Sequence, residues 1–300
     1  MSNDYDKVNG HIKPEWLKIK LPQQGDAYAE TARIVRRHAL NTICSSAMCP
    51  NKAECWGRRT ATFMILGDVC TRNCKFCATK TGNPLPADSD EPKRIADSIR
   101  LMGLRHAVIT SVTRDDLADG GARHWASVVE AVRAVNPQTT IELLIPDLCA
   151  DAGLLDIVIA SSPDIIGHNI ETVERLTPQV RSRARYDVSL AVLRHIAARG
   201  AVPKSGIMVG MGETEDEVLQ TLDDLRGAGC RIVTLGQYLR PTLKHLAVAE
   251  YVDPERFGKY REAALARGFD HVASGPLVRS SYMAEQAVVT RPRTAAEYSQ

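Results

Sequence analysis

Apolar runs of strand length alternate with segments of helical periodicity along most of the chain. The runs predict six strands, at 60–66, 106–112, 140–146, 164–170, 201–211 and 230–238. The segments between and after them place apolar residues three or four positions apart, and predict helices at 91–103, 124–135, 150–161, 186–200, 214–229 and 254–268. Thr214 and Glu217 have the spacing of a capping box at the start of one helix.

Six β–α units of this kind predict an α/β fold built on a parallel sheet. The strand interiors are mostly apolar, as in parallel strands that are covered on both faces. A closed TIM-type barrel has eight such units, so the count favours a partial (β/α)6 barrel. A doubly wound open sheet is the alternative.

The two ends of the chain lack this alternation. Residues 1–28 are polar and predict an extended arm, and a helix is predicted at 31–40. After the sixth strand and its helix, 269–276 predicts only a short extended piece before the tail. We therefore expect one integrated catalytic domain in three parts: an N-terminal arm at 1–58, the partial barrel at 59–240 and a C-terminal extension at 241–300.

Composition narrows the possible partners and compartments. The chain has 300 residues, and its 38 basic and 36 acidic side chains give a net charge of +2, which does not favour a nucleic-acid binder. No apolar run approaches the ~20 residues that cross a bilayer. The N-terminus is polar and carries Asp4 and Asp6, unlike a signal or transit peptide. We expect a soluble, cytoplasmic protein that binds neither membranes nor nucleic acid.

Six of the eight cysteines form two triplets on either side of the first predicted strand. One is Cys44, Cys49 and Cys55, and the other is Cys70, Cys74 and Cys77. Each triplet is one ligand short of a closed zinc site or of an all-cysteine cubane iron–sulfur cluster. Three cysteines on a cubane leave one iron open to another ligand. Zinc with a histidine as fourth ligand is less favoured, because the nearest histidine is His38.

The other two cysteines, Cys149 and Cys230, stand alone in apolar surroundings. We expect both to be small core residues.

Polar residues follow the predicted strands where a site is expected. The active sites of parallel α/β folds lie at the carboxyl ends of the strands. The residues at these positions, besides the second triplet, are Thr110, Ser111, 114–116, His168, Asn169, Glu171, 210–213, Gln237, Tyr238 and Arg240. Most of them fit ordinary caps and loops equally well, and Glu213 fits a residue that orients its turn.

The spacing CxxxCxxC of the second triplet, with Phe76 before its last cysteine, resembles the radical S-adenosylmethionine (SAM) enzymes. The spacing CxxxxCxxxxxC of the first triplet, together with the RSSY sequence at 279–282, resembles the lipoyl synthase family within that superfamily. Further similar segments run from about Lys13 to Tyr282, including CPNKAECW, TSVTRDDLADGGA, HNIETV, KSGIMVGMGETEDEV and TLGQYLRPT.

The resemblance implies the chemistry and the cofactors. The enzyme would be a sulfurtransferase that inserts sulfur at C6 and C8 of an octanoyl chain on a carrier-protein lysine and gives lipoyl-lysine. Cys70, Cys74 and Cys77 would hold a 4Fe–4S cluster whose open iron binds SAM. Reductive cleavage of SAM would give the 5′-deoxyadenosyl radical that abstracts hydrogen from the octanoyl chain.

The resemblance also implies the remaining site residues. Cys44, Cys49 and Cys55 would hold an auxiliary 4Fe–4S cluster that is consumed as the sulfur donor. Its fourth ligand would come from RSSY; we choose Ser281, with Ser280 as the alternative. Asn169 and Glu171 are expected to contact SAM. No other catalytic residue is expected.

The implied partners are octanoylated lipoyl-carrier domains, namely the E2 subunits of 2-oxoacid dehydrogenases and the H protein of glycine cleavage. A low-potential electron donor, such as flavodoxin or ferredoxin, and an iron–sulfur carrier that rebuilds the spent cluster are also implied. Two other functions remain open. One is a different two-cluster sulfur inserter, similar to methylthiotransferases or biotin synthase. The other is an electron-transfer or zinc protein, although electron-transfer clusters normally have four cysteines.

Overall fold

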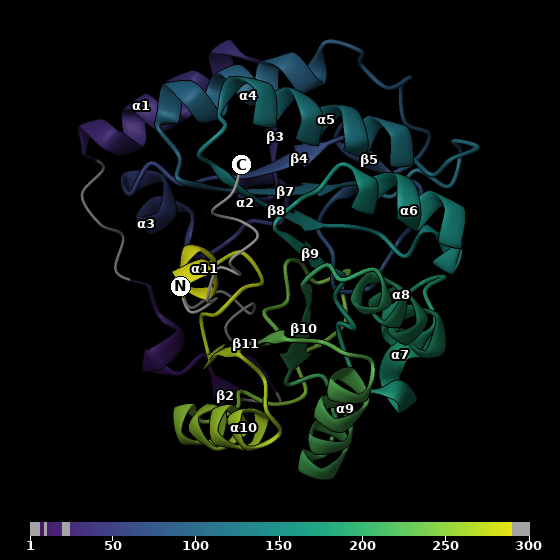
Figure 1. The fold of residues 1–300 in the computed structure, drawn as a ribbon. Coiled ribbons are helices and arrows are strands. Elements are labelled where there is room, and N and C mark those ends of the chain that lie inside the picture. Colours follow the sequence, from purple (N-terminus) through teal and green to yellow (C-terminus); the bar gives the residue numbers. More distant parts are fainter. Residues whose placement is uncertain (1–6, 9–10, 20–24, 290–300) are drawn as a thin grey trace.

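The computed structural model describes residues 7–8, 11–19 and 25–289, and its centre is one open sheet of eight strands (Figure 1). The strands lie in the order β12-β11-β10-β9-β8-β7-β4-β3. All neighbours pair in parallel except β3 and β4, which are antiparallel. The six predicted strands are present as β4 (Thr62–Ile65), β7 (His106–Ser111), β8 (Thr140–Leu144), β9 (Ile165–Gly167), β10 (Pro203–Val209) and β11 (Ile232–Gln237).

The parallel strands follow one another across the sheet in chain order. A doubly wound sheet would instead reverse its strand order at a switch point, so that alternative is wrong. The two edge strands, β12 and β3, do not pair with each other. The predicted α/β fold with a parallel, partly closed sheet is therefore confirmed.

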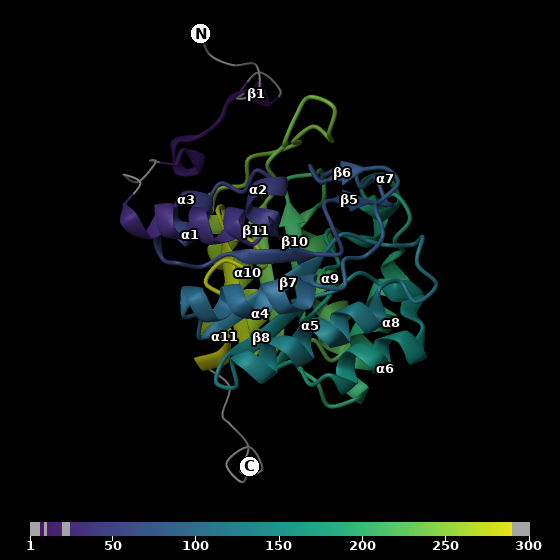
Figure 2. The same ribbon diagram turned by 90° about the horizontal axis from the view of Figure 1, so that it is seen from above.

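Helices cover the outer face of this curved sheet, as Figures 1 and 2 show. The six predicted ones are α4 (Glu91–Met102), α5 (Ala122–Val135), α6 (Ala152–Ala160), α8 (Tyr186–Ala198), α9 (Glu215–Gly227) and α10 (Pro254–Ala266). The predicted capping box begins α9: the Glu217 N–H donates to Thr214 Oγ1, and the Glu217 carboxylate accepts from the Thr214 N–H. Two large apolar clusters lie between the helices and the strands.

Shorter elements connect the units or precede the barrel. They are β1 (Lys7–Val8), β2 (His11–Ile12), the 3-10 helix η2 (Glu15–Leu17), α2 (Ile43–Ser46), α3 (Lys52–Gly57), β5 (Val69–Cys70), β6 (Lys80–Thr81), η3 (Leu148–Ala150), η4 (Glu174–Leu176), α7 (Thr177–Val180) and α11 (Glu285–Val289). Among the described residues, none of the helices combines the length and apolar character needed to cross a membrane.

Four expectations about the ends of the chain and the lone cysteines are wrong in part. The segment 269–276 contains β12 (His271–Gly275), a full strand beside β11. The unpredicted β3 (Asn41–Thr42) extends the other edge. The first helix is α1 (Asp26–Arg37), which starts earlier than predicted and ends before Ala39 takes a left-handed backbone with φ 48°. Cys230 is buried as expected, but Cys149 is exposed.

A buried ion pair joins two strands near the amino ends of the sheet. Lys204 Nζ on β10 donates to Glu142 Oε1 on β8 over 2.6 Å, and both side chains are at most 3% exposed. His106 on β7 lies 3.5 Å from the other carboxylate oxygen. Burial raises the pKa of Glu142, but Lys204 and His106 outweigh this effect and hold that pKa below its ordinary value. The carboxylate is therefore ionised inside the fold.

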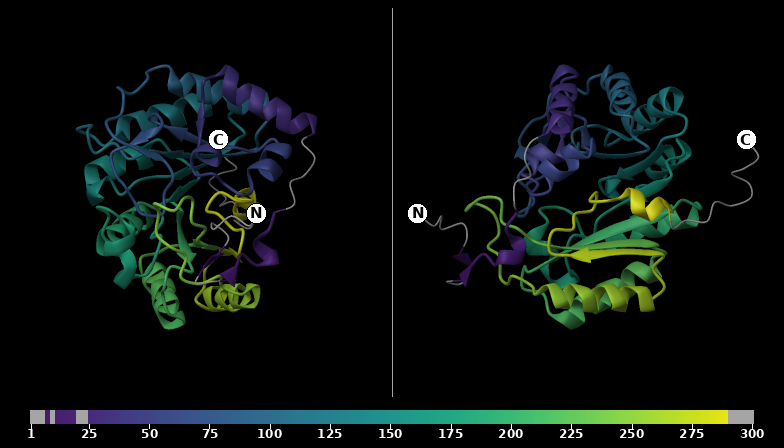
Figure 3. Two further views of the ribbon diagram at one scale, coloured as in Figure 1. Left: turned by 180° about the vertical axis from the view of Figure 1, so that it is seen from behind. Right: turned by 90° about the vertical axis from the view of Figure 1, so that its left-hand side faces the viewer.

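The C-terminal segment runs back across the open side of the sheet. Figure 3 (right) shows it in yellow, crossing between the blue and green halves of the sheet. Asn51 Nδ2 donates to the Leu277 carbonyl over 2.7 Å, and Arg58 pairs with Glu285 over 2.7 Å. These contacts tie residues near 280 to α3 and its preceding turn, more than two hundred positions earlier.

Candidate active site

The second cysteine triplet follows β4: Cys70 ends β5, and Cys74 and Cys77 lie in the loop between β5 and β6. Figure 2 shows β5, β6 and α2 at the same end of the molecule. The Cys77 N–H donates to the Cys74 carbonyl, and the Gly82 N–H donates to the Cys70 carbonyl, so the loop is folded back on itself. Burial raises the pKa of the Cys77 thiol, although Thr79 lowers it by hydrogen bonding. The three cysteines of the triplet are free thiols, each partly buried.

The first triplet lines a small cavity together with Ser281. Cys44 is on α2, Cys49 lies between α2 and α3, and Cys55 is on α3. The cavity is lined by Cys44, Cys49, Asn51, Lys52, Cys55, Thr60, Ala61, Thr62, Arg279, Ser281 and Tyr282. Ser281, and not Ser280, is among these residues. Three thiols and one hydroxyl therefore line one cavity. These are four possible ligands, the number that a cubane cluster requires.

Hydrogen bonds hold Ser281 in this cavity. Thr62 Oγ1, at the start of β4, donates to Ser281 Oγ over 2.8 Å. Tyr282 OH donates to Glu54 on α3 over 3.0 Å. The Val278 carbonyl lies so close to β11 that a Cβ at Gly236 would be 2.1 Å from its oxygen, and only glycine fits there. The tail is thus anchored on α3, β4 and β11.

The thiols of the first triplet affect one another. Burial, together with the neighbouring Cys44 and Cys49, raises the pKa of Cys55 to about 12. Burial also raises the pKa of Cys49, while the nearby Arg279 guanidinium lowers it. Thiols that coordinate a metal lose their protons. Crowded and buried thiols of this kind therefore all ionise only when a cation is bound.

The two triplets stand near opposite ends of β4. Thr60 and Thr62 of the cavity lie at its start, and Cys70 follows its end. Four residues of strand span roughly 13 Å. Among the described residues, no three His, Cys, Asp or Glu side chains are grouped as ligands of a single metal ion. The cysteines of a cubane bind different iron atoms and stand further apart than the ligands of one ion.

Asn169 and Glu171 follow β9 and lie against β10. An isolated bridge pairs Glu171 with Ile207, and a Cβ at Gly206 would lie 2.9 Å from Asn169 Oδ1. The Asn169 Oδ1 atom is buried and has no hydrogen-bond partner. Burial raises the pKa of Glu171, partly offset by Arg181 and Asn169. One unused acceptor and one carboxyl group therefore lie together beside the fifth predicted strand.

Other polar residues that the sequence placed at the carboxyl ends of the strands have structural partners. His168 Nδ1 donates to the Ile145 carbonyl, its Nε2 accepts from Ser189 Oγ, and burial lowers its pKa to about 4. Glu213 accepts from the Gly210 and Met211 N–H groups and so orients its turn, as expected. The Gln237 side-chain amide donates to the Glu250 carbonyl and accepts from the Val252 N–H.

Comparison with known proteins agrees with this geometry. The family model of the radical SAM superfamily matches residues 64–225, more than half of the chain. The lipoyl synthase of Parabacteroides distasonis is 58% identical over 276 residues, which are 92% of this chain and 98% of that protein. The chain belongs to the lipoyl synthase family. The lipoyl synthase of Treponema denticola is 53% identical over 93% of this chain and 96% of its own length.

A solved structure supports the fold of this lipoyl synthase family member. Methylornithine synthase superposes with a TM-score of 0.55, over 78% of this chain and 83% of its own, at 13% identity. At this identity the likeness concerns the fold alone.

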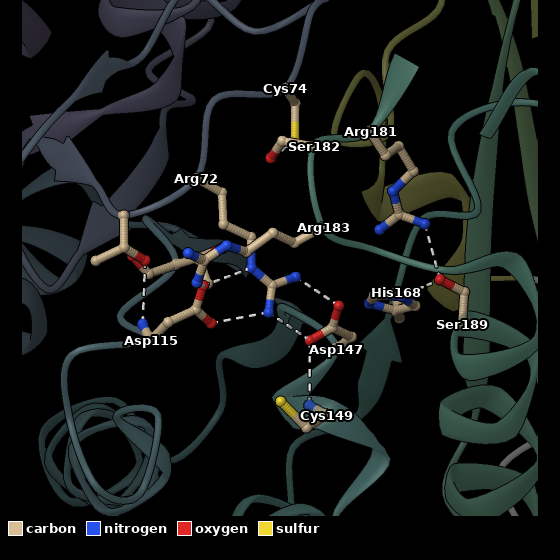
Figure 4. A network of polar contacts seen from close by, with 12 residues as sticks. Arg72, Cys74, Asp115, Asp147, Cys149, His168, Arg181, Ser182, Arg183 and Ser189 are labelled. Atoms are coloured by element: carbon tan, nitrogen blue, oxygen red, sulfur yellow. Dashed lines mark hydrogen bonds and ion pairs between the residues drawn. The ribbon is translucent and has the colours of Figure 1, made fainter. Parts of the chain in front are cut away.

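Two features of the candidate site were not foreseen from the sequence. One is Thr62, whose only sequence signal is its position at the start of a strand beside the first triplet. The other is Arg72, which lies between Cys70 and Cys74 and pairs with Asp115 and Asp147 (Figure 4). A charged residue inside a cysteine motif was the available signal for Arg72.

Proposed function

We propose that this protein inserts sulfur at C6 and C8 of an octanoyl chain carried on a protein lysine, and so produces lipoyl-lysine. The observation that carries the proposal is the cavity in which Cys44, Cys49 and Cys55 meet Ser281, at one end of β4. The second triplet follows the other end of that strand. Sulfur insertion requires a radical-generating site and a sulfur donor within reach of one substrate chain, and this arrangement provides for both.

The residues fit the cofactors of the family. Cys70, Cys74 and Cys77 would hold one 4Fe–4S cluster and leave an iron for SAM. Cys44, Cys49, Cys55 and Ser281 would hold the auxiliary one. When bound, these groups supply the electron, the SAM-derived radical and the sulfur. The chain supplies ligands, orients the substrate and excludes water.

Ser281 is suited to be a ligand that later dissociates from its iron. An alkoxide oxygen is a harder ligand than a thiolate, and thiolates suit the iron of iron–sulfur clusters better. Thr62 Oγ1 points at the same oxygen and offers a hydrogen bond to it. The partly buried Arg279 adds positive charge next to the triplet.

Asn169 and Glu171 would contact SAM. The unpartnered Asn169 Oδ1 offers an acceptor to a ribose hydroxyl, because buried polar atoms normally have a partner. The Glu171 carboxyl group lies beside it. The absent Cβ of Gly206 leaves room for Asn169 against the strand.

The substrate would be an octanoylated lipoyl-carrier domain, of a 2-oxoacid dehydrogenase E2 subunit or of the glycine cleavage H protein. A flavodoxin or ferredoxin would supply electrons, and an iron–sulfur carrier would rebuild the auxiliary cluster. All eight cysteines are free thiols, which suits a reducing compartment such as the cytoplasm.

A mass measurement on the carrier tests the activity. Protein reconstituted anaerobically with iron and sulfide is incubated with SAM, a reductant and an octanoylated carrier domain. The expected result is a carrier that gains two sulfur atoms. A cluster-replete protein that leaves the carrier unchanged would refute the proposal, and zinc in place of iron and sulfide would favour a structural metal protein.

A further inference from the structure

Arg72 makes the densest set of charged contacts at the candidate active site. Its side chain is 9% exposed. Nε and Nη2 donate to the two Asp115 oxygens, each over 2.8 Å. Nη1 and Nη2 donate to the two Asp147 oxygens over 2.5 and 2.9 Å. Four of the five N–H groups of the guanidinium are therefore used in two forked ion pairs.

These ion pairs join the cysteine loop to two strand ends. Asp115 follows β7 and Asp147 follows β8, so Arg72 spans two neighbouring strands from within the Cys70–Cys77 loop. Figure 4 shows the guanidinium between the two carboxylates, with Arg183 next to Asp115. Arg183 is 3.7 Å from Asp115 and largely exposed, so it adds little.

Uncharged hydrogen bonds fasten the same loop alongside Arg72. The Thr71 N–H and Oγ1 both donate to the Thr113 carbonyl, over 3.1 and 3.0 Å. The Asp115 N–H donates to Thr71 Oγ1 over 3.1 Å. The loop therefore lies along 113–115, the segment that follows β7.

The result of this fastening is seen at Cys70. Its Sγ accepts one hydrogen bond from the Arg72 N–H and one from the Thr113 N–H, both at 3.4 Å. Sulfur accepts hydrogen bonds weakly, so these two bonds do not themselves fix the position of their donors. Their geometry depends on how firmly the cysteine loop and the segment 113–115 are held together. Hydrogen bonds to cluster sulfurs are one of the factors that set the reduction potential of iron–sulfur clusters.

We propose that Arg72 is a positioning residue: with Asp115 and Asp147 it holds the cysteine loop against 113–115, keeps two N–H donors on Cys70 Sγ, and thereby raises the reduction potential of the SAM-binding cluster. The proposal rests on the proposed function in one respect, that Cys70 is a ligand of that cluster. N–H donors stabilise the extra negative charge of the reduced cluster, so their loss makes reduction harder.

Arg72→Lys is the decisive substitution. It keeps the charge, but a single ammonium group cannot reproduce two forks, so a change in potential reports position and not charge. The reconstituted full-length protein is titrated with reductant in the presence of SAM, and the SAM-responsive EPR signal is followed. We expect at least a tenfold lower ratio of reduced to oxidised cluster at a fixed potential, which is about 59 mV for one electron.

Two further variants complete the experiment. Thr71→Val removes the two hydrogen bonds of Thr71 Oγ1, to the Thr113 carbonyl and from the Asp115 N–H, without changing charge. It should shift the potential in the same direction. Arg133→Lys is the matched control, because Arg133 bonds Asp164 and the Thr139 carbonyl at the other end of the sheet; its potential should equal that of the wild type. Loss of only the SAM-responsive cluster in Arg72→Lys, with native circular dichroism, would also support a positioning role.

Unchanged potentials in both Arg72→Lys and Thr71→Val would overturn the proposal. If Arg72→Lys does not fold, Thr71→Val decides alone. Cys70→Ala separates this failure from failure of the ligand assignment: if that variant keeps its SAM-responsive cluster, Cys70 is no ligand, whatever Arg72 does.

Discussion

Thr62 and Ser281 share a hydrogen bond of 2.8 Å although 219 positions separate them in the sequence. The bond fixes the second serine of RSSY at the start of β4, inside the cavity that Cys44, Cys49 and Cys55 line. Ser280 does not line that cavity. The structure thus places Ser281, the serine chosen from the sequence, and not the alternative Ser280, beside the three thiols.

Ser281→Ala should still assemble both clusters but lose transfer of sulfur, because three thiolates retain the cluster while its release is no longer controlled. Ser281→Cys should retain the auxiliary cluster too firmly to give up its sulfide. Ser280→Ala is the matched control and should form lipoyl product normally. Carrier mass and iron content are measured for each variant; wild-type lipoyl formation by Ser281→Ala would eliminate this residue as the ligand.

Substitutions in the two triplets should separate two steps of the reaction. Cys74→Ala should abolish formation of 5′-deoxyadenosine and leave about half of the iron, since the other triplet is intact. Cys55→Ala should still cleave SAM but insert no sulfur. Chromatography of 5′-deoxyadenosine and mass spectrometry of the carrier read the two steps. Normal 5′-deoxyadenosine from Cys74→Ala, or lipoyl product from Cys55→Ala, would reverse the assignment.

Asn169→Ala should weaken SAM binding about two- to tenfold, the effect of one hydrogen bond worth roughly 0.5–1.5 kcal/mol. Equilibrium dialysis of labelled SAM against the reconstituted protein measures the dissociation constant. Asn136→Ala serves as control, because Asn136 bonds the Ala96 carbonyl near the amino ends of the strands. Equal affinities of Asn169→Ala and the wild type would remove Asn169 from the SAM site.

Asp147 should stabilise the cluster-free fold above acidic pH only. Burial raises its pKa, but hydrogen bonding to and attraction by Arg72 prevail and lower it from 3.8 to about 2. A carboxyl group with a lowered folded-state pKa stabilises the fold above the unfolded-state pKa and loses this effect as pH falls through the folded-state value. Asp147→Asn should therefore cost up to ~2 kcal/mol at pH 7, and about half of that at pH 3. Urea unfolding at both values measures the difference, and a cost that does not change with pH would contradict the assignment.

Lys204→Met should destabilise the fold by roughly 3–5 kcal/mol, because it leaves the Glu142 carboxylate buried without its partner. The double variant Lys204→Met/Glu142→Gln removes both charges and should recover much of that loss. Urea unfolding of the cluster-free chain compares the two. A double variant that is less stable than Lys204→Met would show that the pair is not the cause.

Periodicity predicted the barrel well, because its helices and most of its strands are long enough to show their own pattern. It failed where a segment depends on a neighbour. β12 has partly polar positions and forms a strand through pairing with β11. β3 is two residues long, too short for any pattern. α1 begins at Asp26, but its fully buried residues start only at Thr31, so its first turn shows no clear apolar period.

The candidate site was predictable as far as the types of its side chains go, because cysteines at fixed spacing and RSSY are local signals. Contacts between residues far apart in the sequence were not predictable. Arg72 reaches Asp147 across 75 positions, and Thr62 reaches Ser281 across 219. No spacing rule connects such pairs, since the strand order alone brings them together. Cys149 was misjudged for a similar reason: apolar neighbours in sequence did not place it in the core.

The return of the C-terminal segment to α3 has a consequence during synthesis. Cys44, Cys49 and Cys55 leave the ribosome more than two hundred residues before Ser281. At 5–20 residues per second, this interval lasts about 11–47 s. The loop around Cys70 finds its partners 113–115 and Asp147 early in that interval. Translation would therefore complete the loop of the second triplet first and the cavity of the first triplet last, so a truncated product would carry Cys44, Cys49 and Cys55 without the serine that lines their cavity.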